Sequence, residues 1–264
     1  MRPSLALVST IALAAAALGA QQPSSYSYDF RASGDHDSDA MRGTVRVNGG
    51  RARLDMQDDQ GDRQYMLVSA DGREVTVVKP DDRTYTVFSG DDFAHLASLG
   101  MRAAGGVLTM KLHDATIEST RLGKGEVIAG HSTQHVRVTE RWSMDVGAMG
   151  FTEPMNQSVE TEYYFDPSFR MARNPLVEIV TSAMTVMPAT DPEFAAREDS
   201  VRKSIVRGMP LRTVITEHDE KGRTSRMVVE VTRIGTDRVT DAELRVPAGY
   251  TRKDGDLGRF KVKL

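Results

Sequence analysis

The sequence predicts a β-rich α+β fold in which roughly ten or more antiparallel strands form one strongly curved sheet, with two or three helices covering its concave face. Apolar and polar residues alternate from Tyr26 to Phe88, and turn signals recur about every 8–12 residues, a spacing that is typical of a meander of hairpins. The alternation returns in 108–165 and 211–234, on either side of a stretch with a period of about 3.6 at 174–206. Short loops between consecutive strands require antiparallel pairing.

The first part of the sheet is marked by aromatic residues and tight turns. Tyr26, Tyr28 and Phe30 occupy alternate positions, so they share one face of a strand. Asn48-Gly49-Gly50 suits the positive φ angles of a short hairpin, and Asp71-Gly72 marks a later turn. This part therefore reads as a series of hairpins.

The strand most clearly buried on one face runs from Val136 to Val146. Its apolar positions alternate with polar ones such as Arg137 and Thr139. Asp114 lies where the apolar row of the preceding strand changes parity, which predicts a β-bulge.

The helices are predicted mainly between the two sets of strands. Asn174 and Pro175 suit the N-cap and first turn of an amphipathic helix that ends before Pro188. A second, charged helix is expected to follow it, up to Gly208. A short helix is also expected at 92–102.

The chain begins with a predicted secretory signal peptide, residues 1–20, in which Arg2 precedes an apolar run and small residues lie at the expected cleavage site. We expect one curved-sheet domain at 21–250, with a helical insert at about 174–206, and a C-terminal tail or edge strand at 251–264. The predicted location is periplasmic or secreted. The chain has no cysteine, which excludes a lipidated cysteine, disulfides and thiol chemistry.

Composition and motifs give little indication of a reaction. The formal charge of −3 is small and dispersed, so no nucleic-acid partner is expected. No Gly-x-Ser-x-Gly motif, phosphate-binding loop or dinucleotide fingerprint occurs, and no cofactor is predicted. We therefore predict a non-enzymatic protein.

Two patterns resemble metal sites but depart from them. His131 and His135 are four residues apart, and in an extended strand that spacing separates them by roughly 13 Å, too far for one ion. Asp35, Asp37 and Asp39 imitate the start of a calcium loop, but the later glycine and glutamate of that motif are missing. No metal site is predicted.

Glu140 and a group of methionines suggest a binding surface. Glu140 lies between Val138 and Trp142 on an apolar strand face, where an unpaired carboxylate is costly to bury. An arginine partner or a position at the rim explains it, and a ligand-facing acid is the alternative. Methionine suits both core filling and adaptable apolar surfaces. The hypothetical cavity lining consists of Trp142, Met144, Glu140, Ile179, Met184 and Met187.

Three segments carry a family resemblance. They are Ile128-Ala129-Gly130 with the strand to Trp142, Gly208-Met209-Pro210-Leu211-Arg212, and Val246-Pro247-Ala248-Gly249-Tyr250. In this order they resemble a family of secreted bacterial proteins classed as a domain of unknown function. The layout is more distantly similar to the lipoprotein-localisation carriers of the LolA and LolB type. That resemblance implies a half-barrel with an apolar cavity between sheet and helices, and it implies no catalytic residue.

The leading functional hypothesis is an exported protein of the cell envelope that binds an apolar ligand, such as a lipid or a lipoprotein acyl chain. One alternative is a structural or protein-interaction module whose concave face is filled by its own side chains. Another is a hydrolase that uses carboxylates, which would need two acids in one cleft.

Overall fold

The computed structural model describes residues 25–35, 41–57, 63–90, 109–148, 151–168, 209–218 and 222–253, together with six residues between 193 and 201. These residues form one sheet of twelve strands. The strands are β1 (Ser25–Ser33), β2 (Met41–Asn48), β3 (Arg51–Gln57), β4 (Arg63–Val68), β5 (Glu74–Lys79), β6 (Thr84–Ser89), β7 (Thr109–Ile128), β8 (His131–Ala148), β9 (Phe151–Phe165), β10 (Pro210–His218), β11 (Thr224–Gly235) and β12 (Thr251–Arg252).

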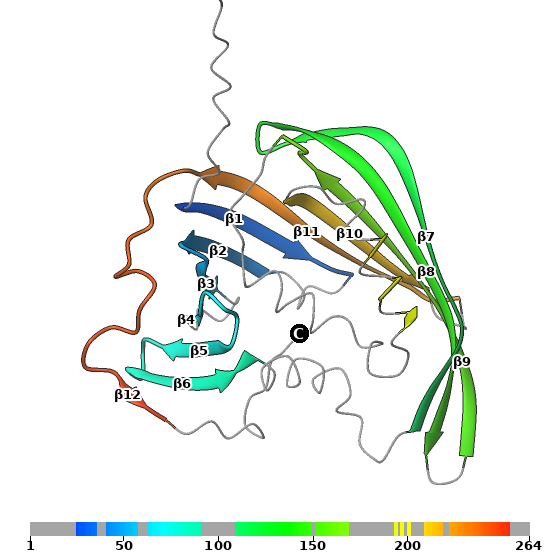
Figure 1. The fold of residues 1–264 in the computed structure, drawn as a ribbon, viewed down its shortest axis with the longest axis horizontal. Helices are drawn as coiled ribbons and strands as arrows, with labels where there is room; N and C mark the ends of the chain where they lie inside the picture. The colour runs from blue at the N-terminus through cyan, green and yellow to red at the C-terminus, as the bar shows by residue number, and fades with distance from the viewer. Residues whose placement is uncertain are drawn as a thin grey trace, which may run out of the picture.

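The strands follow the order β12-β6-β5-β4-β3-β2-β1-β11-β10-β9-β8-β7, and Figure 1 shows that the sheet they form is strongly curved. Two meanders, β1 to β6 and β7 to β11, meet where β1 pairs with β11. Residues about 200 positions apart in sequence are thereby neighbours in the middle of the sheet, for example Tyr28 and Ile234. The meandering, antiparallel pairing predicted from the alternating pattern is confirmed for these eleven strands.

The predicted fold class is nevertheless wrong in two respects. The sheet is mixed, because β12 pairs parallel with β6 through Thr251 opposite Thr84. The described part of the chain also contains no complete helix over the concave face; only Gly90 and scattered residues between 193 and 201 have helical backbone. The helices predicted at 92–102 and 174–187 lie outside the described residues. A helical period shows that a segment can form an amphipathic helix, but it does not show where that helix docks.

Local turn chemistry agrees with the sequence. Gly49 and Gly50 both have positive φ, at 57° and 79°, as a two-residue hairpin between β2 and β3 requires. The bulge predicted at Asp114 is present: the register of β7 shifts between His113 and Thr116, and Asp114 has a φ of 50°.

The two faces of the sheet differ in composition. One face, which we call the inner face, carries the row Tyr28, Val45, Leu54, Met66 and Val77 from β1 across to β5, with each residue opposite the next. These residues belong to the largest buried apolar cluster, which also includes Leu211 and Val231. A smaller cluster of Val136, Val138 and Phe165 continues on β8 and β9.

The other face, the outer face, is crossed by residues 236–250, which we call the strap. The strap leaves β11, passes on the outside of the curve and ends at β12 beside β6 (Figure 1). Its Val246 and Tyr250 pack against a third apolar cluster, which contains Tyr65, Leu67 and Val78. Because the strap lies outside the curve, the inner face is the concave one.

Candidate functional site

The inner face of β1 to β6 is an apolar wall rich in aromatic side chains. Tyr26 is 1% exposed, and its ring stacks on that of Tyr28 with 6.5 Å between centroids. Phe30 continues the row, and its ring occupies the space beside Gly43, where a Cβ atom would lie 2.6 Å from Phe30 Cε1. The wall is therefore closely packed and depends on the small residue at position 43.

The sheet does not close into a barrel through its described strands, because its order ends at β12 on one side and at β7 on the other. The described strands therefore surround the concave side only in part. β12 is only two residues long, whereas β7 runs for 20 residues. The sequence predicted a concave face covered by helices, and the described residues include no such helix.

Two of the predicted lining residues lie together on β8. Glu140 is 9% exposed, and its cross-strand neighbours are Ile117 on β7 and Val159 on β9. Trp142 is half-buried two residues further along the same strand, opposite Gln157. Glu140 is therefore a buried residue of the inner face, in register with an apolar residue on each neighbouring strand.

The other predicted lining residues are placed only in part. The backbone of Met144 continues β8 and is opposite Met155 of β9 and Leu112 of β7. Ile179, Met184 and Met187 lie outside the described residues. The predicted cavity lining thus stays a prediction, of which Glu140 and Trp142 are the part that the structure brings together.

The predicted site residues do not include the aromatic wall, although the sequence places Tyr26, Tyr28 and Phe30 on one face of a strand. The available signal was the alternation itself, which does not say whether a buried face contacts a ligand or only the rest of the chain. The pairing of β1 with β11 placed this face in the centre of the sheet.

A polar hollow of about 450 Å³ lies at the β6 edge of the inner face. It is lined by Lys79, Asp82, Thr84, Thr86 and Lys253. Lys253 follows β12 and is held there because its N–H donates to the carbonyl of Tyr85, at 2.8 Å. The apolar inner face thus ends in a rim with two lysines, one carboxylate and two hydroxyl groups.

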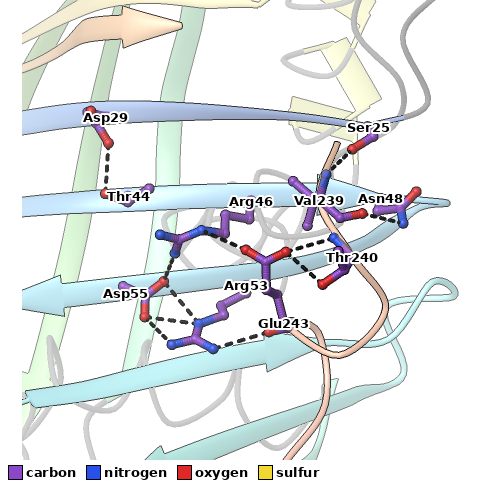
Figure 2. A network of polar contacts seen from close by, with 10 residues as sticks. All are labelled: Ser25, Asp29, Thr44, Arg46, Asn48, Arg53, Asp55, Val239, Thr240 and Glu243. Carbon is purple, nitrogen blue, oxygen red and sulfur yellow. Dashed lines mark hydrogen bonds and ion pairs between the residues drawn. The ribbon is translucent and has the colours of Figure 1, made fainter. Parts of the chain in front are cut away.

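A polar network fixes the strap to the outer face (Figure 2). Arg46 bonds to Asp55, and Arg53 donates three hydrogen bonds to the same carboxylate, at 2.6, 2.9 and 3.0 Å. Arg53 also donates to the backbone carbonyl of Glu243, and the Glu243 carboxylate accepts the N–H of Thr240 at 2.7 Å. These contacts attach the strap to β2 and β3.

Further contacts hold the start of the strap. The side chain of Asn48 donates to the carbonyl of Val239 at 2.8 Å, and the Val239 N–H donates to Ser25 Oγ at 2.7 Å. Arg51 pairs with Asp241. Val239 and Leu244 are both buried, so the strap is held by apolar contacts as well as by polar ones.

The outer face of β8 and β9 carries mutually paired charges. Glu162 accepts hydrogen bonds from Arg137 at 2.6 Å and pairs with His135 at 3.1 Å. The ring of His135 stacks on Tyr164, with 4.1 Å between centroids. Burial alone would raise the pKa of Glu162, but the Arg137 hydrogen bond and the neighbouring positive charges hold it below the ordinary value.

His131 and His135 belong to separate pairs. His131 Nδ1 is 2.9 Å from Asp166, whereas His135 is bound to Glu162. No group of three or more histidine, aspartate or glutamate side chains is placed to hold a metal ion in the part of the chain that the structure describes. Within the same residues, no helix is long and apolar enough to cross a membrane.

Comparison with known proteins finds similar solved structures. No protein family model and no curated protein matches the chain. A crystal structure of a LolA superfamily protein from Nitrosomonas europaea matches 84% of this chain and 90% of its own, with 10% sequence identity and a TM-score of 0.31. A TM-score of this size is too low to assign a fold family or a function.

Proposed function

We propose that this chain is an exported, non-enzymatic protein of the cell envelope that binds an apolar ligand, of the lipid or acyl-chain class, against the inner face of its sheet. Residues 1–20 serve as the export signal in this proposal, which places the mature protein in the periplasm or outside the cell. Glu140, Trp142 and Met144 of β8 contribute to the lining, together with Ile179, Met184 and Met187.

The observation that carries the proposal is the continuous apolar surface on the concave side of an open sheet. Its buried cluster extends over β1 to β6 and reaches β10 and β11. Concave, mostly apolar surfaces with a few convergent polar groups are typical of small-molecule sites. Glu140 on β8 and the lysine-bearing hollow at β6 supply such polar groups at the two sides of the wall.

Native mass spectrometry of protein exposed to a lipid extract tests the proposal directly. The protein should be delipidated, incubated with an extract of bacterial envelope lipids and sprayed under non-denaturing conditions. We expect discrete adducts with the masses of lipids, because a lipid that binds the apolar face removes its own apolar surface from water. Unmodified protein across several different extracts would contradict the proposal.

A matched variant sharpens this test. Trp142→Glu adds a charge to the inner face of β8, whereas Arg141→Glu changes the neighbouring, exposed position on the opposite face. We expect the first variant to lose adducts and the second to retain them, with unfolding midpoints compared so that lost binding is not confused with lost folding. Equal adduct formation by both variants would remove Trp142 from the site.

The second candidate is an interaction module whose concave face is filled by the chain itself. The burial of Tyr26, Leu211 and Phe194 favours it, since each is at most 1% exposed. The two candidates differ in outcome: a filled interior takes up no lipid, and its inner-face substitutions change stability without changing adduct masses.

A further inference from the structure

We propose that the hollow at the β6 edge binds the anionic headgroup of an amphiphile whose apolar chain lies along the inner face. This inference rests on the proposed function and adds a substrate class to it: an ionised carboxylate or phosphate joined to a hydrocarbon chain. The hollow has a volume of about 450 Å³ and is lined by Lys79, Asp82, Thr84, Thr86 and Lys253.

The register of β5 and β6 connects the hollow to the apolar wall without a break. Val75 lies opposite Phe88, Val77 opposite Thr86, and Lys79 opposite Thr84. Alternate residues of a strand share a face, so all three pairs belong to the inner face. Polarity therefore changes along these two strands from apolar, through a hydroxyl, to a cation.

The length of this gradient suits an amphiphile. Lys79 follows Val77 by two residues, a rise of roughly 7 Å along the strand. A headgroup at the lysines would place the start of the chain at Val77 and Phe88, which are 4% and 5% exposed, so the chain has to displace the groups that cover this part of the large apolar cluster.

The chemistry of the hollow favours an anion. Two lysines and one aspartate line it, and the threonine hydroxyls can donate hydrogen bonds to anionic oxygens. Asp82 opposes anion binding, which makes the expected effects of substitution opposite in sign at Asp82 and at the lysines. A site for a cation would show the reverse pattern.

The strap brings one of the two lysines to this place. Thr251 donates its N–H to the carbonyl of Arg83 at 2.9 Å, and Lys253 donates to that of Tyr85. Because Thr251 is opposite Thr84, Lys253 two residues later returns to the inner face beside Thr84 and Thr86. Lys79 and Lys253 are 174 residues apart in sequence, so only the parallel pairing of β12 assembles the hollow.

Paired ligands provide the test. Oleate and oleyl alcohol share a hydrocarbon chain and differ in the charge of the headgroup, and binding of each to the full-length protein can be measured by isothermal titration calorimetry. We expect oleate to bind about fivefold more tightly or better, with the difference shrinking as salt is added. Equal affinities would overturn the inference and leave the proposed function intact, whereas binding of neither ligand would contradict both.

Variants locate the headgroup. Lys79→Gln combined with Lys253→Gln should abolish the preference for oleate, and Asp82→Asn should strengthen oleate binding by about two- to threefold without changing the affinity for oleyl alcohol. Lys124→Gln, at an exposed lysine on β7, serves as the matched control and should change neither affinity. A preference for oleate that survives in the double variant, or an unchanged oleate affinity in Asp82→Asn, would overturn the inference.

Inorganic phosphate and phosphatidic acid separate the possible sources of the anion. We expect phosphatidic acid to compete with oleate at low concentration and inorganic phosphate to act only through its ionic strength. If phosphate alone bound as tightly as the lipid, the hollow would be a site for free anions, and the amphiphile would be the wrong ligand class.

Discussion

The part of the sheet from β1 to β6 and the part from β7 to β9 are built from similar alternating strands, yet they are stabilised differently. The first part is packed on both faces, by the large inner cluster and by the strap with Val246 and Tyr250 outside. The second has a small inner cluster, and its outer face carries ion pairs such as Arg137 with Glu162. Alternation of apolar and polar residues therefore does not determine whether one face of a strand or both will be covered by apolar contacts.

The two parts of the sheet therefore have different roles in the proposed site. The doubly packed part provides a fixed surface and the polar hollow, whereas β7 to β9 form a wall held mainly from one side. Val127 on β7 is 68% exposed, and the edge of this strand faces no other described strand. Amide hydrogen exchange should accordingly be slower in β2 to β5 than in β7.

The largest expected effect is the loss of a central aromatic side chain from the doubly packed part. Tyr26→Ala should reduce the free energy of unfolding by about 3–5 kcal/mol, because the ring is fully buried and its removal leaves a cavity. Urea unfolding measures this change. Leu122→Ala, at an exposed position on β7, is the control and should stay within about 0.5 kcal/mol of the original protein.

The next effect concerns the strap. Leu244→Ala should cost about 2–3 kcal/mol, since Leu244 of the strap is only 6% exposed. It should also accelerate hydrogen exchange in β6 and β12 more than in β8. Arg245→Ala, at the exposed neighbouring position, should leave both measurements nearly unchanged. Uniform acceleration throughout the sheet would contradict a local role for the strap.

The smallest effect is expected on the outer face of β8 and β9. The pKa of Glu162 is lower in the folded chain than in the unfolded one, so this group stabilises the fold above about pH 4.3 and loses that contribution as the pH falls through the folded-state pKa. Glu162→Gln should flatten this part of the pH–stability curve and change stability at neutral pH by at most about 1 kcal/mol. The midpoint of urea unfolding, measured as a function of pH for both proteins, tests this prediction. A variant that loses stability more steeply than the original protein as the pH falls would contradict it.

Features set by local chemistry could be predicted from the sequence. Gly49 and Gly50 predicted a hairpin because few other residues adopt positive φ readily, and the parity change near Asp114 predicted a bulge. The one-sided burial of β8 followed from the alternation around Val136 and Val138. In each case, residues close in sequence determine the outcome.

Features set by distant pairing could not be predicted. The parallel pairing of β12 with β6 depends on the path of the strap, and two residues such as Thr251 and Arg252 carry too little pattern to indicate a strand. The hollow combines Lys79 with Lys253 for the same reason. Glu140 was recognised from its position between Val138 and Trp142, but its two apolar cross-strand neighbours became known only from the register.

Fluorescence of Trp142 tests the role of the inner face most directly, because Trp142 is the only tryptophan in the chain and lies on that face of β8. A fatty acid brominated along its chain quenches a tryptophan that it contacts, whereas the unbrominated acid does not. We expect saturable quenching by the brominated acid, relieved by an excess of the unbrominated one. Fluorescence that is unchanged while the fatty acid demonstrably binds would place the ligand away from the β8 wall and contradict the proposed site.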